Sequence, residues 1–231
     1  MKYDAYKKDV LACTQWLSEH GYFGALRGTG GNVSVRIAGE QAVAVTPSTL
    51  PYRDLTYTDI CIVDFDLQPI EGDYPPSVET GMHIAVYRNR LDINAVVHTH
   101  QLKASVLSLI AEPLPALYDE VALHLGDKID VVPYALSGTP ELLENVTANL
   151  GNNCHSYIMQ NHGALNLGET LEKAWLNVEL LEKTAETYIA ALSTGREVKP
   201  LPADIVDLLV IIRKDAQDKA IAKNRERSET L

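Results

Sequence analysis

Three histidines lie at the ends of apolar segments, at spacings that suit a metal site. His98 and His100 stand two residues apart after the run Ala95–Val97, and His162 follows a second apolar stretch. In an extended segment residues i and i+2 point to one face, so the imidazoles of His98 and His100 can lie side by side. Three neutral imidazoles are a common ligand set for Zn²⁺, with a fourth position for a carboxylate, water or substrate. The spacing therefore indicates metal-assisted chemistry.

The alternative is that these are hydrogen-bonded structural histidines, the usual role of a single buried His. Two protonated imidazoles on one face repel each other, so the pair favours a bridging cation; spacing alone leaves both interpretations open. Glu79 follows Ser77 at an expected helix start and can ligate a metal or act as a general base. An ordinary first-turn glutamate is the alternative, which spacing alone favours. His83, four residues further on the same helix face, would lie behind the ligands.

Three loops rich in small polar residues offer donors for an anion. The first is Gly28–Ser34, which contains Gly31 and Asn32; the second is Thr46–Thr49, and Ser77 marks the third. Backbone N–H groups, an amide and hydroxyls suit a phosphate or carboxylate. Each loop taken alone is more often a tight turn.

Composition places limits on the class of protein. A chain of 231 residues with 46% hydrophobic content can bury one core, so a single domain over residues 1–231 is expected. Its net charge of −11 argues against non-specific nucleic-acid binding. Three separated cysteines and the absence of a signal-like or bilayer-length apolar stretch predict a cytoplasmic protein without disulfides. The charged tail from about Arg213 is expected to be a surface helix or a mobile end.

Hydrophobic periodicity predicts helices that alternate with strands. The expected helices cover Asp4–His20, Ser77–Arg90, Gln101–Ile110, Pro140–Leu150, a segment from about Glu169 to Tyr188, and Leu201–Ile212. The expected strands cover Val33–Ile37, Ala42–Thr46, Asp59–Phe65, Ala95–His100, Ile129–Pro133 and Ser156–Gln160. The first two strands should form a hairpin at Gly39. No glycine-rich dinucleotide fingerprint is present, so the class is α/β with a mainly antiparallel sheet between helices.

Five motifs, in order, resemble those of the class II aldolase/adducin family. They are GGNVSVR from Gly30, TPS from Thr46, PSVE from Pro76, AVVHTH from Ala95 and QNHG from Gln160. The resemblance extends over roughly residues 6–191. It implies a three-layer αβα fold and a homotetramer with active sites at the subunit interfaces.

The resemblance also implies a reaction and residues for it. Metal-dependent aldolases of this family cleave ketose 1-phosphates, such as fuculose 1-phosphate, to dihydroxyacetone phosphate and an aldehyde. By motif match the Zn²⁺ ligands (another divalent ion is an alternative) would be Glu79, His98, His100 and His162. Glu79 would also move the proton on dihydroxyacetone phosphate, and Tyr118 the proton on the aldehyde oxygen. The substrate phosphate would be held by Gly31, Asn32, Ser48, Thr49 and Ser77.

Departures from the family pattern bear on the substrate. Thr49 stands where the family commonly has glycine, and Val78 where phosphate-binding members often have a second serine. No tyrosine follows Tyr188, although one aldolase of the family uses a C-terminal tyrosine. These differences favour another aldehyde fragment. Alternatives with the same metal chemistry are a decarboxylase, a sugar-phosphate 4-epimerase and a dehydratase. A non-catalytic adducin-like scaffold is a further alternative, against which the retained histidines and Glu79 argue.

Overall fold

The computed structural model describes residues 1–24 and 30–229, and its centre is a sheet of eight strands. Their order is β4-β3-β2-β1-β5-β10-β9-β8. Neighbouring strands in the described sheet are antiparallel except β8 and β9, which are parallel. The expectation of a mainly antiparallel sheet is confirmed.

The elements follow one another with short connections. The strands are β1 (Asn32–Arg36), β2 (Ala42–Val45), β3 (Cys61–Asp64), β4 (Pro69–Glu71), β5 (Ala95–Thr99), β6 (Leu114–Pro115), β7 (Lys128–Ile129), β8 (Val131–Val132), β9 (Ser156–Met159) and β10 (Gly163–Gly168). The α-helices are α1 (Asp4–Glu19), α2 (Thr80–Asn89), α3 (Leu102–Ile110), α4 (Asp119–His124), α5 (Pro140–Asn149), α6 (Leu171–Ser193) and α7 (Ala203–Glu229). The 3₁₀ turns are η1 (Tyr52–Asp54), η2 (Tyr57–Asp59) and η3 (Leu150–Asn152).

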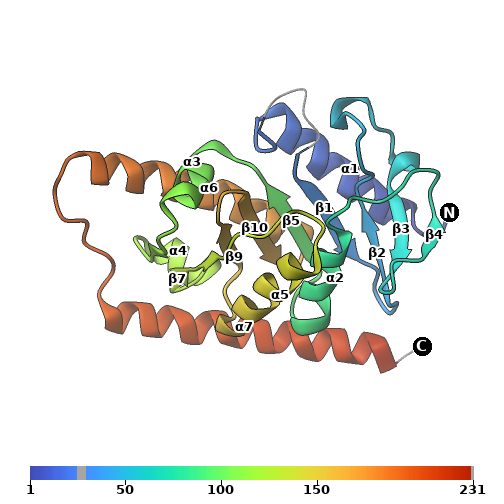
Figure 1. The fold of residues 1–231 in the computed structure, drawn as a ribbon. Coiled ribbons are helices and arrows are strands. Elements are labelled where there is room, and N and C mark those ends of the chain that lie inside the picture. Colours follow the sequence, from blue (N-terminus) through green and yellow to red (C-terminus); the bar gives the residue numbers. More distant parts are fainter. Residues whose placement is uncertain (25–29, 230–231) are drawn as a thin grey trace.

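Helices cover both faces of the sheet and make three layers (Figure 1). On one face, Met82 of α2 and Val146 of α5 share an apolar cluster with Val96 of β5. On the other face, Val10 of α1 and Val178 of α6 cluster with the adjacent residue, Val97. Successive strand residues point to opposite faces, so a central strand buried on both sides reads as an uninterrupted apolar run. The αβα expectation is confirmed.

The helix expected to be capped by Ser77 begins at Thr80, and Glu79 is its N-cap residue. The Ser77 hydroxyl accepts the N–H of Glu79 at 3.3 Å, a short turn that competes with helix formation at this point. The predicted cap was therefore wrong by two residues. The consequence is that Glu79 sits at the helix end that faces the sheet, rather than inside the first turn.

One predicted strand needed correction, and one strand of the sheet was not predicted. The segment expected as one strand over 129–133 is divided: Lys128–Ile129 pairs with β6, and Val131–Val132 pairs with β9 in the main sheet. Strand β10 was not predicted, because Gly163, Asn166 and Gly168 interrupt its apolar pattern. It nevertheless lies between β5 and β9, fully buried.

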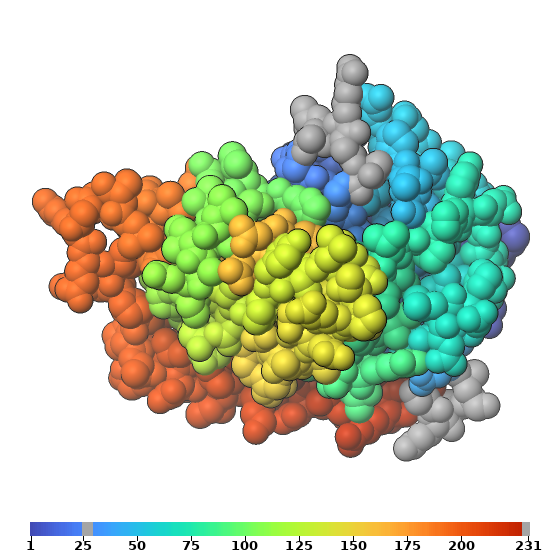
Figure 2. Space-filling view, in the orientation of Figure 1, coloured from blue at the N-terminus to red at the C-terminus, as the bar shows by residue number. Residues whose placement is uncertain are grey.

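Helix α7 extends far beyond the expected end at Ile212. It runs along the lower edge of the body, red in Figures 1 and 2, after a connection that projects to the left. Arg213, buried, donates to the carbonyl of Ala122 at 2.7 Å, and Gln217 donates to the carbonyl of Asn153 at 2.8 Å. The charged tail is therefore a helix packed on the body. Among the described helices, none has the length and apolar content that crossing a bilayer requires.

Candidate metal centre

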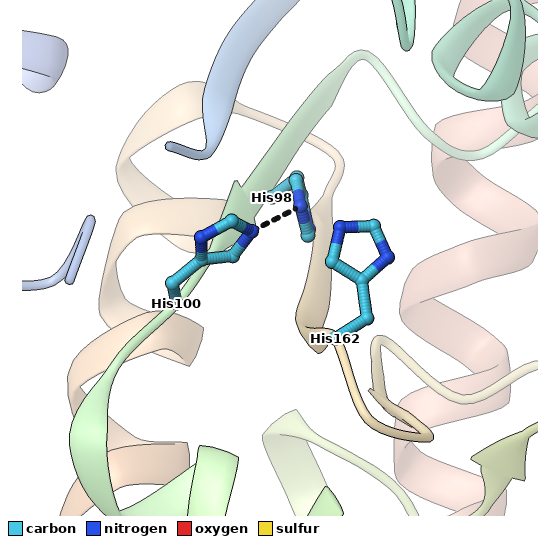
Figure 3. Close-up of side chains that lie close together, drawn as sticks. All are labelled: His98, His100 and His162. Carbon is cyan, nitrogen blue, oxygen red and sulfur yellow. Dashed lines mark hydrogen bonds between the residues drawn. The ribbon is translucent and has the colours of Figure 1, made fainter. Parts of the chain in front are cut away.

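The side chains of His98, His100 and His162 converge on one point, as Figure 3 shows. His98 lies on β5, His100 follows that strand, and His162 ends the turn between β9 and β10. The Nε2 atoms of His98 and His100 are 3.0 Å apart. The ring centroid of His162 lies 4.7 Å from that of His98 and 5.3 Å from that of His100. The three residues predicted as metal ligands are thus brought together.

Sheet register and tight turns bring them there. His98 lies directly opposite Asn32 of β1 and Leu165 of β10, so these side chains share one face of the sheet. The turn before Gly163 has three residues, and Asn161 takes a left-handed conformation with φ of 52°. Such a turn is common in short hairpins, and Asn tolerates that conformation.

Two glycines make room for the ring of His100. A Cβ on Gly30 would lie 2.6 Å from its Nδ1, and a Cβ on Gly163 would lie 2.9 Å from its Cδ2 and 2.2 Å from the carbonyl oxygen of Thr99. All three separations are shorter than van der Waals contact. The backbone therefore approaches His100 at points where only glycine fits.

The carboxylate of Glu79 lies beside the histidines. Its Oε2 is 3.3 Å from Nε2 of His98, and its Oε1 is 3.3 Å from Nε2 of His162. The amide of Asn32 donates to Oε2 at 2.8 Å, while the buried Oε1 has no hydrogen-bond partner among the described residues. A buried carboxylate oxygen aimed at imidazole nitrogens, without a donor of its own, fits a cation ligand.

The protonation states agree with this interpretation. The Nδ1–H of His98 donates to the carbonyl of Ala164 at 2.9 Å, which leaves the Nε2 lone pair free. Burial lowers the pKa of His98 to about 3, and burial together with His162 lowers the pKa of His100. Burial raises the pKa of Glu79, but His98, His162 and Asn32 outweigh it and lower that pKa to about 2. Neutral imidazoles and an ionised carboxylate are the forms that bind a divalent cation.

The loops proposed to bind phosphate lie next to one another and next to Glu79. The N–H of Ser48 donates to the carbonyl of Pro75 at 2.9 Å, and the N–H of Ser77 donates to the carbonyl of Thr46 at 3.0 Å. Thr49 has φ of 65°, which is the left-handed region where glycine is favoured, and where the family commonly has glycine. Of the first loop, Gly28 and Thr29 lie outside the described residues.

Asn32 and Gly31 have different roles in the first loop: one makes a side-chain hydrogen bond, and the other allows a backbone turn. The Asn32 amide is already engaged by Glu79, so it serves the carboxylate. Gly31 has φ of 70°, and a Cβ there would lie 2.3 Å from the ring of Phe23. The glycine is therefore required by the backbone turn.

Tyr118 lies at the surface of the chain. Its side chain is 41% exposed, and it is the residue before α4. No hydrogen bond, ion pair or ring contact of the described residues joins it to Glu79 or to the three histidines. Ser137, which was not predicted, does reach the cluster: its hydroxyl lies 3.4 Å from Nε2 of His162. Nothing in the spacing of the loop Pro133–Thr139 marks that serine.

Comparisons with known proteins agree with the fold and the site. The sequence profile of the Class II Aldolase and Adducin N-terminal domain matches residues 8–189. An L-fuculose phosphate aldolase of Escherichia coli O6:H1 is 36% identical over 192 residues, 83% of this chain and 86% of that protein. A 5-methylthioribulose-1-phosphate/5-deoxyribulose-1-phosphate aldolase of Escherichia coli O45:K1 is 37% identical over 192 residues, 83% and 87% of the two chains. A solved structure of L-fuculose 1-phosphate aldolase superposes with a TM-score of 0.82 at 32% identity, covering 91% and 96%.

The chain belongs to the class II aldolase and adducin family, and it is an enzyme, an aldolase of the lyase class. The family resemblance of its motifs is confirmed, as is its similarity to L-fuculose-1-phosphate aldolase. The aldolases of this family are generally metal-dependent, and His98, His100 and His162 form the candidate metal site. The alternative of a non-catalytic adducin-like scaffold is therefore rejected.

Proposed function

We propose that the enzyme is a Zn²⁺-dependent aldolase that reversibly cleaves a ketose 1-phosphate to dihydroxyacetone phosphate and an aldehyde. The observation that carries this proposal is the convergence of three imidazole nitrogens with the carboxylate of Glu79. Three histidines and a displaceable fourth ligand are typical of catalytic zinc sites. The identity of the metal is part of the proposal, since another divalent ion suits the same ligands.

The substrate class is proposed from the relatives and the loops. The relatives are named for aldolases that act on phosphates of fuculose, 5-methylthioribulose and 5-deoxyribulose. In this chain the proposed phosphate site comprises Gly31, Asn32, Ser48, Thr49 and Ser77. Within the described residues, the Ser48 hydroxyl has no partner and the Ser77 hydroxyl only accepts a hydrogen bond, so both can donate to an anion. Asn32 contributes indirectly, because its amide holds Glu79.

The residues divide the proton transfers between them. A divalent cation bound by the histidines supplies a Lewis acid beside the ketose carbonyl and its neighbouring hydroxyl. In cleavage, Tyr118 in its phenolate form accepts the proton of the C4 hydroxyl as the C3–C4 bond breaks, an aldehyde leaves, and the electron pair of the broken bond stays on the C3 side. Glu79 in its carboxylic-acid form then delivers a proton to C3 to complete dihydroxyacetone phosphate. In synthesis each residue moves its proton in the opposite direction.

The exposed position of Tyr118 leaves its side chain available to a neighbouring subunit. Its side chain is 41% exposed, and within the described residues its hydroxyl makes no hydrogen bond with Glu79 of its own chain. A homotetramer with active sites at subunit interfaces accounts for this, since Tyr118 of one subunit then serves the histidines of a neighbour. The tetramer is proposed from the family resemblance together with the exposure of Tyr118.

A panel of ketose 1-phosphates tests the proposal. L-fuculose 1-phosphate, 5-deoxyribulose 1-phosphate and 5-methylthioribulose 1-phosphate are each incubated with the Zn²⁺-loaded enzyme, and dihydroxyacetone phosphate is measured by a coupled dehydrogenase. We expect release from at least one, abolished by a chelator and restored by Zn²⁺. The aldolase proposal would be contradicted if no substrate of the panel released dihydroxyacetone phosphate. Epimerisation of a pentulose phosphate, dehydration, or CO₂ release from a 3-keto acid would then identify the reaction as one of the alternatives.

A further inference from the structure

His83 is a buried histidine with one ring nitrogen that lacks a hydrogen-bond partner among the described residues. Its side chain is fully buried on α2, and its Nδ1 lies 2.7 Å from the hydroxyl of Ser34 on β1. Its Nε2 is buried and has no hydrogen-bond partner among the described residues. Leaving a buried polar nitrogen unpaired costs about 1–3 kcal/mol, so such an atom needs an explanation.

The unpaired nitrogen belongs to a small group of unpaired atoms around Glu79. The other two in this region are Oε1 of Glu79 and Oδ1 of Asn32, whose amide holds the same carboxylate. His83 follows Glu79 by one helical turn, and its backbone N–H donates to the Glu79 carbonyl at 3.3 Å. Residues four apart on a helix have Cβ atoms about 5–6 Å apart, a distance that a glutamate side chain covers by changing rotamer.

A chain of hydroxyls contacts the Nδ1 side of His83. The Tyr87 hydroxyl donates to the carbonyl of Ser34 at 3.0 Å, and its oxygen lies 2.8 Å from the Ser34 hydroxyl. With the Tyr87 proton used in this way, the Ser34 hydroxyl keeps its own proton and can donate it to Nδ1 of His83. In that arrangement the neutral ring carries its proton on Nε2, the nitrogen without a hydrogen-bond partner among the described residues.

We infer that His83 is a positioning residue, whose Nε2–H receives the Glu79 carboxylate when substrate takes its place beside the histidines. This inference rests on the proposed function, in which Glu79 moves the proton at C3 of dihydroxyacetone phosphate. A displaced carboxylate without a donor would sit buried and unsolvated, at a cost that opposes substrate binding. The Nε2–H gives it one charge-assisted hydrogen bond and one defined position.

Two substitutions at the same site separate the two nitrogens of the ring. His83→Asn places an amide where Nδ1 lies and keeps the contact with Ser34, but it has nothing at the Nε2 position. His83→Gln places an amide nitrogen near the Nε2 position and keeps a donor to Glu79. A purely structural role predicts that both variants lose activity in step with their melting temperatures.

The measurement is made on the Zn²⁺-loaded enzyme with dihydroxyacetone phosphate alone, in D₂O. The rate at which the C3 proton exchanges with solvent is followed by NMR. Because no aldehyde is present, this rate reports only the proton transfer that we assign to Glu79. We expect His83→Asn to slow exchange and kcat by about 10–100-fold, the usual effect of losing such a partner, and His83→Gln to retain most of both. The affinity for Zn²⁺, measured by chelator competition, should change less than the exchange rate in either variant.

A second readout does not depend on activity. Nitrogen NMR of the histidine rings in the metal-free enzyme should show His83 neutral and protonated at Nε2, and Ser34→Ala should shift it toward the Nδ1–H form. If His83→Asn does not fold, Ser34→Ala replaces it in the exchange assay, with the same direction expected. An Nδ1–H ring in the unmodified enzyme, or exchange in the folded variant at the unmodified rate, overturns the inference while the aldolase proposal stands. No exchange and no cleavage by the unmodified enzyme overturns both.

Discussion

At the scale of single residues, each ligand-type side chain of the metal centre is oriented by a neighbour from another element. The Ala164 carbonyl of β10 fixes the ring of His98, and the Asn32 amide of β1 fixes Glu79. Partners of this kind set tautomer and orientation, so the ligands are ordered before any substrate arrives. Glu79 has two proposed roles: its carboxylate is a ligand of the metal, and it transfers the proton at C3 of dihydroxyacetone phosphate.

Glu79→Gln tests the second of these roles. Glutamine has the same shape and can still accept the Asn32 amide, so the fold should be retained. Without the carboxylate, turnover of the ketose 1-phosphate should fall by about 10²–10⁴-fold, the usual contribution of a general acid–base residue. The measurement is kcat together with the circular dichroism melting curve. Glu141→Gln, which changes an exposed first-turn glutamate of α5, is the matched control and should leave kcat unchanged.

Gly163→Ala tests the close approach of backbone to His100. The added Cβ would lie 2.2 Å from the Thr99 carbonyl, which belongs to a buried strand and cannot move freely. We expect a loss of about 1–3 kcal/mol of unfolding free energy and weaker Zn²⁺ binding. Urea unfolding and chelator competition measure the two effects. Gly151→Ala, whose Cβ would have nothing within 4 Å, serves as control; equal effects of the two substitutions would contradict the steric explanation.

At the scale of elements, buried polar contacts attach helices to the ends of strands. Arg90, at the end of α2, donates to both carboxylate oxygens of Asp92 at 2.9 and 2.7 Å and to the carbonyl of Cys154 at 2.8 Å. Both side chains of this ion pair are 4% exposed. His155, which precedes β9, lies 3.6 Å from Asp92 and contacts Gln217 of α7. One network therefore connects α2, β9 and α7.

Asp92→Asn should destabilise the protein by about 3–5 kcal/mol, because it leaves the buried Arg90 guanidinium without its counter-charge. Burial raises the pKa of Asp92, but hydrogen bonds from His155 and Arg90 outweigh it and hold that pKa well below its usual range. A depressed pKa contributes stability above the unfolded value of about 3.9 and loses it as the pH falls toward the folded value.

The difference in unfolding free energy between the unmodified protein and Asp92→Asn should therefore be largest near pH 6 and shrink below about pH 4. Urea unfolding over that pH range measures it. Asp66→Asn removes an exposed partner of Arg88 and should cost at most about 1 kcal/mol. A difference that grows toward acid pH would contradict the assignment.

Arg213→Ala tests how α7 is held. The guanidinium is 4% exposed and donates to the buried Ala122 carbonyl and to the exposed Asp127, so its loss removes a hydrogen bond to one buried acceptor. We expect a cost of about 1–3 kcal/mol, and faster amide exchange along α7 measured by mass spectrometry. Arg225→Ala, on an exposed position of the same helix, is the control, and it should change neither quantity.

At the scale of the whole molecule, the described chain brings the three candidate metal-binding histidines together, while the exposed Tyr118 makes no hydrogen bond or ring contact with them among the described residues. Mixing two inactive variants tests whether neighbouring subunits complete the site. His100→Ala lacks a metal ligand and Tyr118→Phe lacks the proposed acid, yet a mixed tetramer contains sites with both intact residues. We expect activity to return after the two variants exchange subunits, in particles of about four times 25.4 kDa. Sedimentation and kcat are measured together, and a monomer or an inactive mixture would contradict the arrangement. The single-domain organisation of residues 1–231 remains a prediction.

By itself the sequence identified the family through the resemblance of its motifs, and that resemblance implied the αβα fold. Spacing within short segments, such as the residues at i and i+2 after the apolar run before His98, indicated the candidate metal-binding histidines. Strand β10 and the packing of α7 on the body were not predicted, because the burial of Gly163–Gly168 and tertiary contacts at Arg213 stabilise segments whose own patterns are weak.

Only the tertiary structure decided which neighbours serve the ligands. Asn32 and Glu79 are separated by 47 positions, and they meet because sheet register places Asn32 opposite His98 while the Ser77 turn starts α2 at Glu79. Local spacing carries no information about such a meeting, so the hydrogen bond from the Asn32 amide to Glu79 was not predicted. The same reason explains why Ser137 gained a place beside the site only once strands and loops were assembled, whereas the spacing of His83 from Glu79 on one helix had already indicated its place.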